Sequence, residues 1–287
     1  MSRIVYVNGE FLAEEDAKIS VFDRGFLFSD GVYEVSSVIR GKLIDNDRHL
    51  ARLARSLGEL NIKAPGTDEK IIEIQKEVVA RNNLDEGMLY LQVTRGAADR
   101  TFLQPKDITP SMVMFTQELC IIDCPDTDIG ISIKTIPDIR WQRRDIKTVS
   151  LLAQSMAKQA AIDSGANDAW MVEDGFVTEG SSNNAYIVTD DNTIVTRNIS
   201  NSILSGITRR AVLELARQNN MKIEERPFTP EEAENAMEAF STAATHPVMP
   251  IVKINDRILS NGKPGPIAAK LVVLYRQMAL ESIGEVD

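Results

Sequence analysis

The chain has few of the residues that build disulfide frameworks, metal centres or nucleic-acid surfaces. Cys120 and Cys124 are the only cysteines, and His49 and His246 are the only histidines among 287 residues. We therefore expect reduced thiols and no metal site. Lysine and arginine total 32 against 42 aspartate and glutamate residues, which gives a net charge of −10. This acidic balance argues against binding nucleic acid or anionic membranes through overall charge.

Long apolar runs are also missing from the sequence. No run approaches the roughly 20 residues that a membrane span requires, and the opening MSRIVYVNGE lacks the apolar core of a signal peptide. We therefore expect a cytoplasmic protein. With 43% hydrophobic and 26% charged residues, the composition is that of a globular chain with room for one large domain or two smaller ones.

Short strand patterns and helix patterns are mixed along the chain without internal repeats. Turn dipeptides between apolar segments predict hairpins at Asn8-Gly9, Arg40-Gly41 and Asp174-Gly175. Helical spacing of apolar residues predicts helices, and their approximate ranges are 47–60, 68–82, 150–163, 206–220, 231–240 and 266–282. Antiparallel strand signals with segregated helices indicate two α+β units, not a regular alternating parallel sheet.

A drop in apolar content with clustered Pro, Asp and Gly divides the chain. We expect a small N-terminal domain over 1–120, a linker over 121–132 and a larger C-terminal domain over 133–287. The C-terminal domain would carry Lys147, which stands just before the helix pattern at 150–163. The apolar residues that we expect to form one face of that helix are Leu151, Leu152, Met156, Ala157, Ala160 and Ala161.

Three weak signals in the second half point together to one kind of chemistry. Lys147 precedes an apolar helix, Glu179 follows an apolar strand, and ILSGITRR places small residues before a helix whose free N–H groups can hold a phosphate. Each has an ordinary alternative: a solvated lysine, a surface turn, and a plain cap by Ser205. An amine, a carboxylate and an anion site without a histidine base or metal are what pyridoxal 5′-phosphate requires.

The ordered motifs DRGFLFSDGVYEV, HLARL, LQVTRG, IRWQRRDIK, EGSSNN and GITR resemble those of the fold-type IV pyridoxal-phosphate aminotransferases (class IV). The resemblance runs over nearly the whole chain and is nearest to the D-amino acid aminotransferases. It implies a two-domain α+β fold with the cofactor between the domains. It also implies a homodimer in which a loop of the neighbouring subunit, carrying Arg100, completes the substrate pocket.

The resemblance also implies roles for individual residues. Lys147 matches the catalytic lysine that forms the Schiff base, and Glu179 matches the carboxylate that pairs with the pyridine nitrogen. The residues that it places around the cofactor phosphate are Arg52, Ser182, Ile207, Thr208 and the backbone of Ala244. Those that it places on the substrate side are Tyr33, Arg100 and Arg140, the last as a support of the cofactor shell. We interpret the adjacent Arg143 and Arg144 as a solvated basic cluster.

Two departures from the D-amino acid pattern bear on specificity. Phe102 stands where an Arg-x-His pair would place a histidine, so one donor to the substrate carboxylate is lost. Losing such a donor weakens binding by about 1–2 kcal/mol, and the ring favours apolar amines. Ala243 and Ala244 stand where hydroxyl residues are frequent, which is more like the branched-chain group. Val35 and Ser37, however, differ from the glycine and arginine of the branched-chain enzymes.

These features predict a transaminase that moves the amino group of a D-amino acid such as D-alanine to a 2-oxo acid such as 2-oxoglutarate. The transfer would pass through a pyridoxamine intermediate, with relaxed scope for (R)-amines. The alternatives are an (R)-selective amine transaminase, a branched-chain aminotransferase and an aminodeoxychorismate lyase. A non-catalytic protein on the same fold is difficult to reconcile with the presence of both Lys147 and Glu179.

Overall fold

The computed structural model describes residues 2–284, and these divide into two compact units. The first unit takes the chain up to Ile121 together with Ile146–Ser150, and the second takes Ile122–Asp145 and the chain from Leu151. The break at 121 lies next to the predicted boundary at 120. The predicted linker 121–132, however, contains helix α4 (Asp126–Ile129) and the start of strand β7 (Ile131–Pro137).

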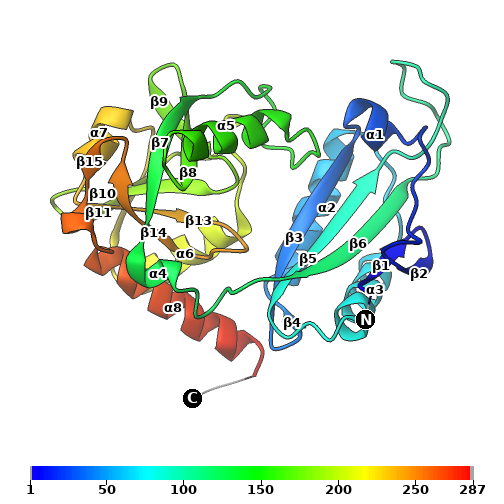
Figure 1. Cartoon of the computed structure of the whole chain (residues 1–287), viewed down its shortest axis with the longest axis horizontal. Coiled ribbons are helices and arrows are strands. Elements are labelled where there is room, and N and C mark those ends of the chain that lie inside the picture. Colours follow the sequence, from blue (N-terminus) through cyan, green and yellow to red (C-terminus); the bar gives the residue numbers. More distant parts are fainter. Residues whose placement is uncertain (1, 285–287) are drawn as a thin grey trace. The chain divides into compact units, whose positions relative to one another are not determined.

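An antiparallel sheet of six strands forms the first unit, in the order β2-β1-β6-β5-β3-β4 (Figure 1). Its strands are β1 (Ile4–Val7), β2 (Glu10–Ala13), β3 (Gly31–Ile39), β4 (Lys42–Leu43), β5 (Gly87–Thr94) and β6 (Ser111–Glu118). Asn8-Gly9 and Arg40-Gly41 form the predicted two-residue hairpin turns, with φ values of 48° and 110° at the first turn and 49° and 70° at the second. Two positive φ values in succession are typical of type I′ turns.

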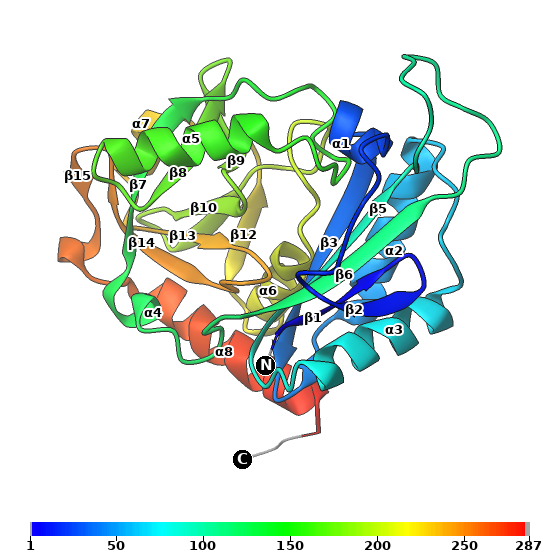
Figure 2. The same ribbon diagram turned by 45° about the vertical axis from the view of Figure 1, so that its right-hand side comes forward.

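Three helices belong to the first unit: α1 (Arg24–Phe28), α2 (Asn46–Glu59) and α3 (Asp68–Arg81). Helix α2 packs on β3, and α3 packs on β1 and β6 (Figure 2). The predicted periodicity of α2 is confirmed, because Leu50, Leu53 and Leu57 are all buried in the core between helices and sheet. Along β3, Val32 and Glu34 face these helices, so the intervening Tyr33 faces the other side of the sheet.

A mixed sheet forms the second unit, in the order β12-β11-β10-β13-β14-β7-β8-β9 with β15 beside β14. Its strands besides β7 are β8 (Asp168–Glu173), β9 (Phe176–Gly180), β10 (Asn184–Val188), β11 (Thr193–Thr196), β12 (Lys222–Glu225), β13 (Glu238–Thr242), β14 (Met249–Ile254) and β15 (Arg257–Ile258). The pairs β11–β12, β14–β7 and β7–β8 are parallel and the others are antiparallel. Asp174-Gly175 makes the predicted β8–β9 turn.

The helices of the second unit besides α4 are α5 (Leu152–Asp163), α6 (Ile207–Gln218), α7 (Pro230–Glu234) and α8 (Pro266–Ser282), with a 3₁₀ turn η1 at Ser260–Gly262. Helix α5 packs on β7 and β8, whereas α6 and α8 pack on each other and on β13. The predicted inner face of α5 was partly wrong. Leu152 and Met156 are 75% and 53% exposed, whereas Ala157 and Ala161 are buried. The small alanines let the helix approach Ala169 and Met171 of β8 closely.

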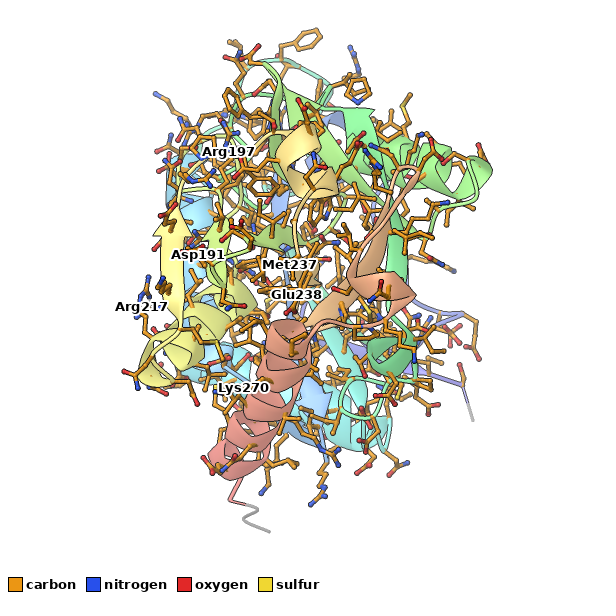
Figure 3. All side chains as sticks on the ribbon, turned by 90° about the vertical axis from the view of Figure 1, so that its left-hand side faces the viewer. Asp191, Arg197, Arg217, Met237, Glu238 and Lys270 are labelled. Atoms are coloured by element: carbon orange, nitrogen blue, oxygen red, sulfur yellow. The ribbon has the colours of Figure 1, made fainter. Side chains whose placement is uncertain are left out.

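The predicted helix over 231–240 was also wrong in its second half. Helix α7 ends at Glu234, and Glu238–Thr242 form strand β13 between β10 and β14. The buried Glu238 carboxylate accepts the N–H groups of Ile267 and Ala268 at 3.0 and 2.9 Å, so it caps the start of α8 (Figure 3). Sheet pairing and this tertiary cap override a local helix pattern. Helix α1 and strand β12 were not predicted.

No helix between residues 2 and 284 is long and apolar enough to cross a membrane. Within the same residues, no group of three or more His, Cys, Asp and Glu side chains is arranged to hold a metal ion.

Candidate active site

Lys147 lies in a short extended segment that runs along β3 of the first unit. The N–H of Tyr33 donates to the Lys147 carbonyl at 3.0 Å, and the N–H of Val149 donates to the Gly31 carbonyl at 3.1 Å. Ile146 is buried in the core of the same unit. The prediction that Lys147 belongs to the C-terminal domain is therefore corrected, because backbone pairing with a distant strand fixes this segment in the first unit.

An aromatic stack lies beneath the Lys147 amine. Its Nζ is 4.2 Å from the ring centroid of Tyr33, which stacks on Tyr90 at 5.4 Å. Tyr90 stacks in turn on Phe115 at 4.7 Å. Burial and the neighbouring Tyr33 raise the pKa of the Tyr90 hydroxyl. The structure thus brings together two predicted site residues, Lys147 and Tyr33, on a ring face that attracts a cationic amine.

Glu34, the residue after Tyr33, lies on the opposite face of β3 and is held by two basic side chains of α2. Arg52 Nε and Nη2 donate to its two oxygens, both at 2.8 Å, and His49 Nδ1 is 2.7 Å away. Burial opposes ionisation of Glu34, but Arg52 and His49 lower its pKa to about 2. Arg52, predicted to bind the cofactor phosphate, therefore has two donors on this carboxylate. His49 and Glu34 stand within the motifs HLARL and DGVYEV, but their pairing with each other and with Arg52 was not predicted.

Folding stability in acid should depend on Glu34. Its pKa lies below the ordinary 4.5, so its contribution is complete above pH 4.5 and is lost as the pH falls towards 2. We expect Glu34→Gln to lower the free energy of unfolding by about 3 kcal/mol at pH 7, and this difference to shrink below pH 4.5. Urea unfolding of the wild type and the variant measures this difference in free energy at each pH. Glu77→Gln, which alters an exposed ion pair with Arg81, is the control, and an equal loss at pH 7 and pH 3 would contradict the assignment.

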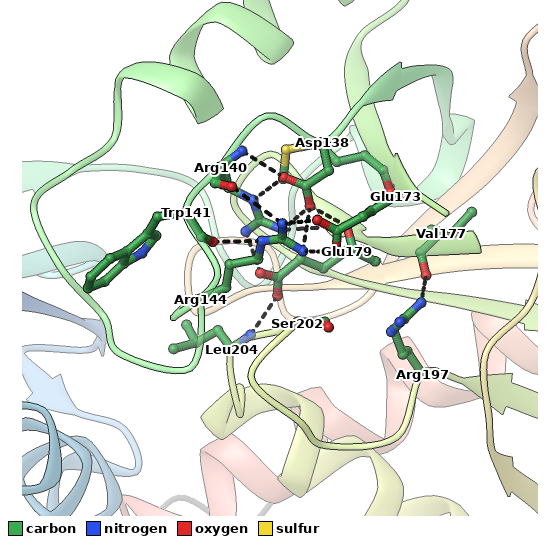
Figure 4. Close-up of polar contacts among 12 residues, drawn as sticks. Asp138, Arg140, Trp141, Arg144, Glu173, Val177, Glu179, Arg197, Ser202 and Leu204 are labelled. Carbon is green, nitrogen blue, oxygen red and sulfur yellow. Dashed lines mark hydrogen bonds and ion pairs between the residues drawn. The ribbon is translucent and has the colours of Figure 1, made fainter. Parts of the chain in front are cut away.

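Glu179 is buried in the second unit, and both of its oxygens are occupied (Figure 4). Arg140 Nη1 donates to Oε1 at 2.5 Å. The side-chain amide of Asn184 and the N–H of Leu204 both donate to Oε2 at 3.0 Å. Burial raises the pKa of Glu179 against the opposing effect of Arg140. Charged and neutral donors together hold this carboxylate in one orientation.

Arg140 is held between two carboxylates. Its Nε and Nη2 donate to Asp138 at 3.0 and 2.7 Å, while Nη1 reaches Glu179 (Figure 4). Burial acts to lower the pKa of Arg140, but its bonds to Asp138 and Glu179 raise it overall. Thr178 Oγ1 donates to Asp138 at 2.6 Å and fixes that carboxylate in turn. Asp138 was not predicted as a site residue. It stands two residues before Arg140, and that spacing in IPDIRW was the available signal.

The interpretation of Arg143 and Arg144 as a solvated cluster was wrong for Arg144. This side chain is buried and donates to Glu173 at 2.7 and 2.5 Å and to the Trp141 carbonyl at 3.0 Å. Arg143 pairs with Asp145 at 3.0 Å and is partly exposed. Two adjacent arginines look alike in a sequence, but only one side chain points into the unit.

The N-cap residue of helix α6 is Gly206, which makes no side-chain cap hydrogen bond. No side chain at the N-cap position therefore covers the first N–H groups of the helix, which include those of Ile207 and Thr208. A Cβ at Gly206 would lie 2.2 Å from Asn184 Oδ1, so glycine is required there. The same Asn184 also donates to Glu179, so one amide connects the buried carboxylate with the helix start.

Ser182 lies exposed in the turn after β9, and its two neighbours are fixed by Asp168. Ser181 Oγ donates to Asp168 at 2.6 Å, and the Asn183 amide donates to it at 2.9 Å. Ala244 is half-buried and follows β13. Arg100 is exposed in the loop after β5 of the first unit, where it contacts two phenyl rings.

Comparison with known proteins places this arrangement in a family. The model described as "Amino-transferase class IV" matches residues 31–254. A D-alanine aminotransferase from Bacillus licheniformis is 38% identical over 265 residues, covering 92% of each chain, and one from Staphylococcus aureus (strain N315) is 36% identical over 270 residues, covering 93% and 94%.

Solved structures agree on the fold. A branched-chain aminotransferase from Thermoproteus uzoniensis superposes with a TM-score of 0.89 at 24% identity, covering 99% of this chain and 97% of that one. The family model matches most of this chain, and the two relatives are similar to it along more than nine-tenths of their own length. This chain belongs to the class IV aminotransferases, which are pyridoxal-phosphate-dependent enzymes.

Proposed function

We propose that this enzyme transfers the amino group of D-alanine and related D-amino acids to a 2-oxo acid such as 2-oxoglutarate. The observation that carries this proposal is the similarity to D-alanine aminotransferases over more than nine-tenths of the chain. The branched-chain enzymes among the solved structures are less than 25% identical, so they bear on the fold and not on the substrate.

The donor groups present fit pyridoxal 5′-phosphate. Lys147 offers a half-buried amine over an aromatic ring, and Glu179 offers a buried carboxylate held by Arg140, Asn184 and Leu204. We assign the Schiff base to Lys147 and the pyridine nitrogen to Glu179. The start of α6, whose N-cap residue is Gly206, is suited to a phosphate because its N–H groups and helix dipole favour an anion. The residues that we assign to the phosphate are Arg52, Ser182, Ile207, Thr208 and the backbone of Ala244.

When bound, pyridoxal phosphate supplies an electron sink for the pair left when the substrate Cα–H bond breaks. Lys147 Nζ accepts the proton from the Cα of the amino donor, and it returns a proton to the Cα of the acceptor in the second half of the reaction. The Tyr33 ring lies beneath this amine, with its centroid 4.2 Å from Nζ, and helps to hold Nζ in position. Arg100 binds the α-carboxylate through paired N–H donors.

Arg140 has a different role in this proposal from the substrate-side role suggested by the sequence. Its guanidinium is bonded to Asp138 and Glu179, so we assign it to orient the carboxylate. Asp138 helps to orient Glu179 through Arg140. It accepts hydrogen bonds from Nε and Nη2 of Arg140, so that Nη1 is directed at Glu179.

We also propose that the protein is a homodimer. Several large apolar side chains are exposed on the segment before and within α1 and in the loop after β5, and these are Val21, Phe22, Phe26, Phe102 and Leu103. Exposed apolar side chains in such number support a protein–protein contact, because leaving them in water is unfavourable. A second copy of the chain is the partner that the family resemblance implies.

Steady-state kinetics with several amino donors tests the proposed substrate. With 2-oxoglutarate as acceptor, we expect kcat/KM for D-alanine to exceed that for L-leucine and for (R)-1-phenylethylamine by at least about tenfold, a difference of about 1.4 kcal/mol in transition-state binding. A higher kcat/KM for L-leucine would favour the branched-chain alternative. A higher value for the amine would show that Phe102 redirects the pocket, and either result would contradict the proposal.

A further inference from the structure

Arg100 is held by aromatic rings and not by carboxylates. Its guanidinium carbon is 5.3 Å from the ring centroid of Phe28 and 5.4 Å from that of Phe102. The two rings meet edge to face at 5.6 Å. Among residues 2–284, no aspartate or glutamate forms an ion pair with Arg100. A guanidinium attracted to ring faces keeps its N–H donors, which lie in its own plane, available for a ligand.

Other arginines of the first unit show how unusual this arrangement is. Arg24 and Arg95 both bind Asp30 at 2.7 Å, and Arg52 binds Glu34. In a chain with ten more acidic than basic residues, carboxylate partners for arginine are abundant. An exposed arginine with ring partners is therefore suited to an external carboxylate, because no internal carboxylate competes for its donors.

The ring on the α1 side is itself held in place. Phe28 ends α1, and the Arg24 guanidinium carbon lies 4.5 Å from its centroid. Arg24 is buried, and it also donates to Asp30 at 2.7 Å and to the Thr101 carbonyl at 2.7 Å. Thr101 stands between Arg100 and Phe102 in the loop. One buried arginine thus fixes both the Phe28 ring and the backbone next to Arg100.

We propose that Phe28 and Phe102 are specificity-determining residues that orient Arg100 towards a substrate carboxylate, and that Arg24 is a positioning residue for this clamp. The assignment rests on the proposed transamination of α-amino acids and deepens it. Phe102 is then more than a lost hydrogen-bond donor, because its ring holds the guanidinium from one side. The ligand class is an amino acid or 2-oxo acid whose carboxylate meets the in-plane edge of Arg100.

Replacing each ring by an aliphatic side chain of similar bulk tests the clamp. We expect Phe28→Leu and Phe102→Leu each to raise KM for D-alanine by about three- to tenfold, with kcat changed by less than about twofold. The inhibition constant of propionate, which carries the carboxylate without the amino group, should rise by the same factor. That of ethylamine, which lacks the carboxylate, should stay constant. Phe28→Tyr should restore the wild-type KM because it restores a ring face.

A matched aromatic–arginine pair elsewhere in the same unit provides the control. Arg81 lies 4.3 Å from the ring centroid of Phe11, so Phe11→Leu removes an equivalent contact and should leave both inhibition constants unchanged. An unchanged KM in Phe28→Leu, or equal rises for propionate and ethylamine, would overturn the clamp. A wild-type enzyme inactive on D-alanine would contradict the proposed function instead. In that case, calorimetric measurement of propionate binding to the wild-type and Phe28→Leu holoenzymes would still test whether the ring orients Arg100 towards a carboxylate.

Discussion

We expect Lys147→Ala to abolish transamination, lowering kcat by about four orders of magnitude or more, because we assign both the covalent bond to the cofactor and the proton transfer to this lysine. The half-buried amine lies 4.2 Å from the Tyr33 ring centroid, on a segment whose backbone is bonded to β3. Removing the side chain beyond Cβ leaves those backbone bonds in place, so the variant should fold. Steady-state assays measure the loss of turnover, and a visible absorption spectrum measures the loss of the covalent bond to the cofactor.

Two controls distinguish this role from a loss of charge or of structure. Lys147→Arg keeps the positive charge over the ring but cannot form the covalent bond, so it should be as inactive as the alanine variant. Lys70→Ala removes an exposed lysine that pairs with Glu73 and should retain wild-type activity. Substantial turnover by Lys147→Arg would contradict the assignment of the Schiff base to Lys147.

The second large effect is expected at Glu179. Replacement by Gln keeps the shape of the side chain but removes the negative charge that we assign to the pyridine nitrogen, so kcat should fall by about 10²–10³-fold. It also leaves the buried Arg140 with only Asp138 as its anionic partner. Cofactor should still bind, because the groups that we assign to the phosphate are unchanged. Activity assays measure the fall in kcat, and cofactor titration measures whether binding is retained.

A second carboxylate of the same unit serves as the matched control for Glu179. Glu225 pairs with Arg209 and Arg217 at 2.8 and 2.9 Å and has no role in the proposed site. Glu225→Gln should therefore leave kcat close to that of the wild type. If Glu179→Gln were equally active, the pairing of Glu179 with the cofactor would be wrong.

Local turn chemistry and helix periodicity allowed much of the fold to be predicted. Asn8-Gly9 and Asp174-Gly175 adopt the expected turns because their conformational preferences are built into two residues. Leucines 50, 53 and 57 are buried because their spacing alone places them on one face. The exposed Leu152 and the strand that begins at Glu238 could not be foreseen in this way. Both depend on what packs against the segment, and that information is distant in the sequence.

The candidate site likewise has features that could be predicted from the sequence and features that depend on tertiary contacts. Lys147 and Glu179 were predicted from residue type and motif, because the chemistry of the cofactor requires an amine and a carboxylate. The bonds of Arg140 to Asp138 and Glu179, and those of Arg52 to Glu34, are tertiary ion pairs. A motif identifies an arginine as important, but only the geometry shows which carboxylate occupies its donors. The ring contacts of Arg100 were missed for the same reason.

The visible absorption spectrum of the purified holoenzyme, recorded before and after adding D-alanine without an acceptor, tests the central claim most directly. We predict a visible band from cofactor bound to the wild-type protein, its loss on adding D-alanine, and its persistence on adding L-alanine. Adding 2-oxoglutarate should then restore the band. A band that D-alanine leaves unchanged, or that L-alanine removes equally well, would contradict the proposed D-amino acid transamination.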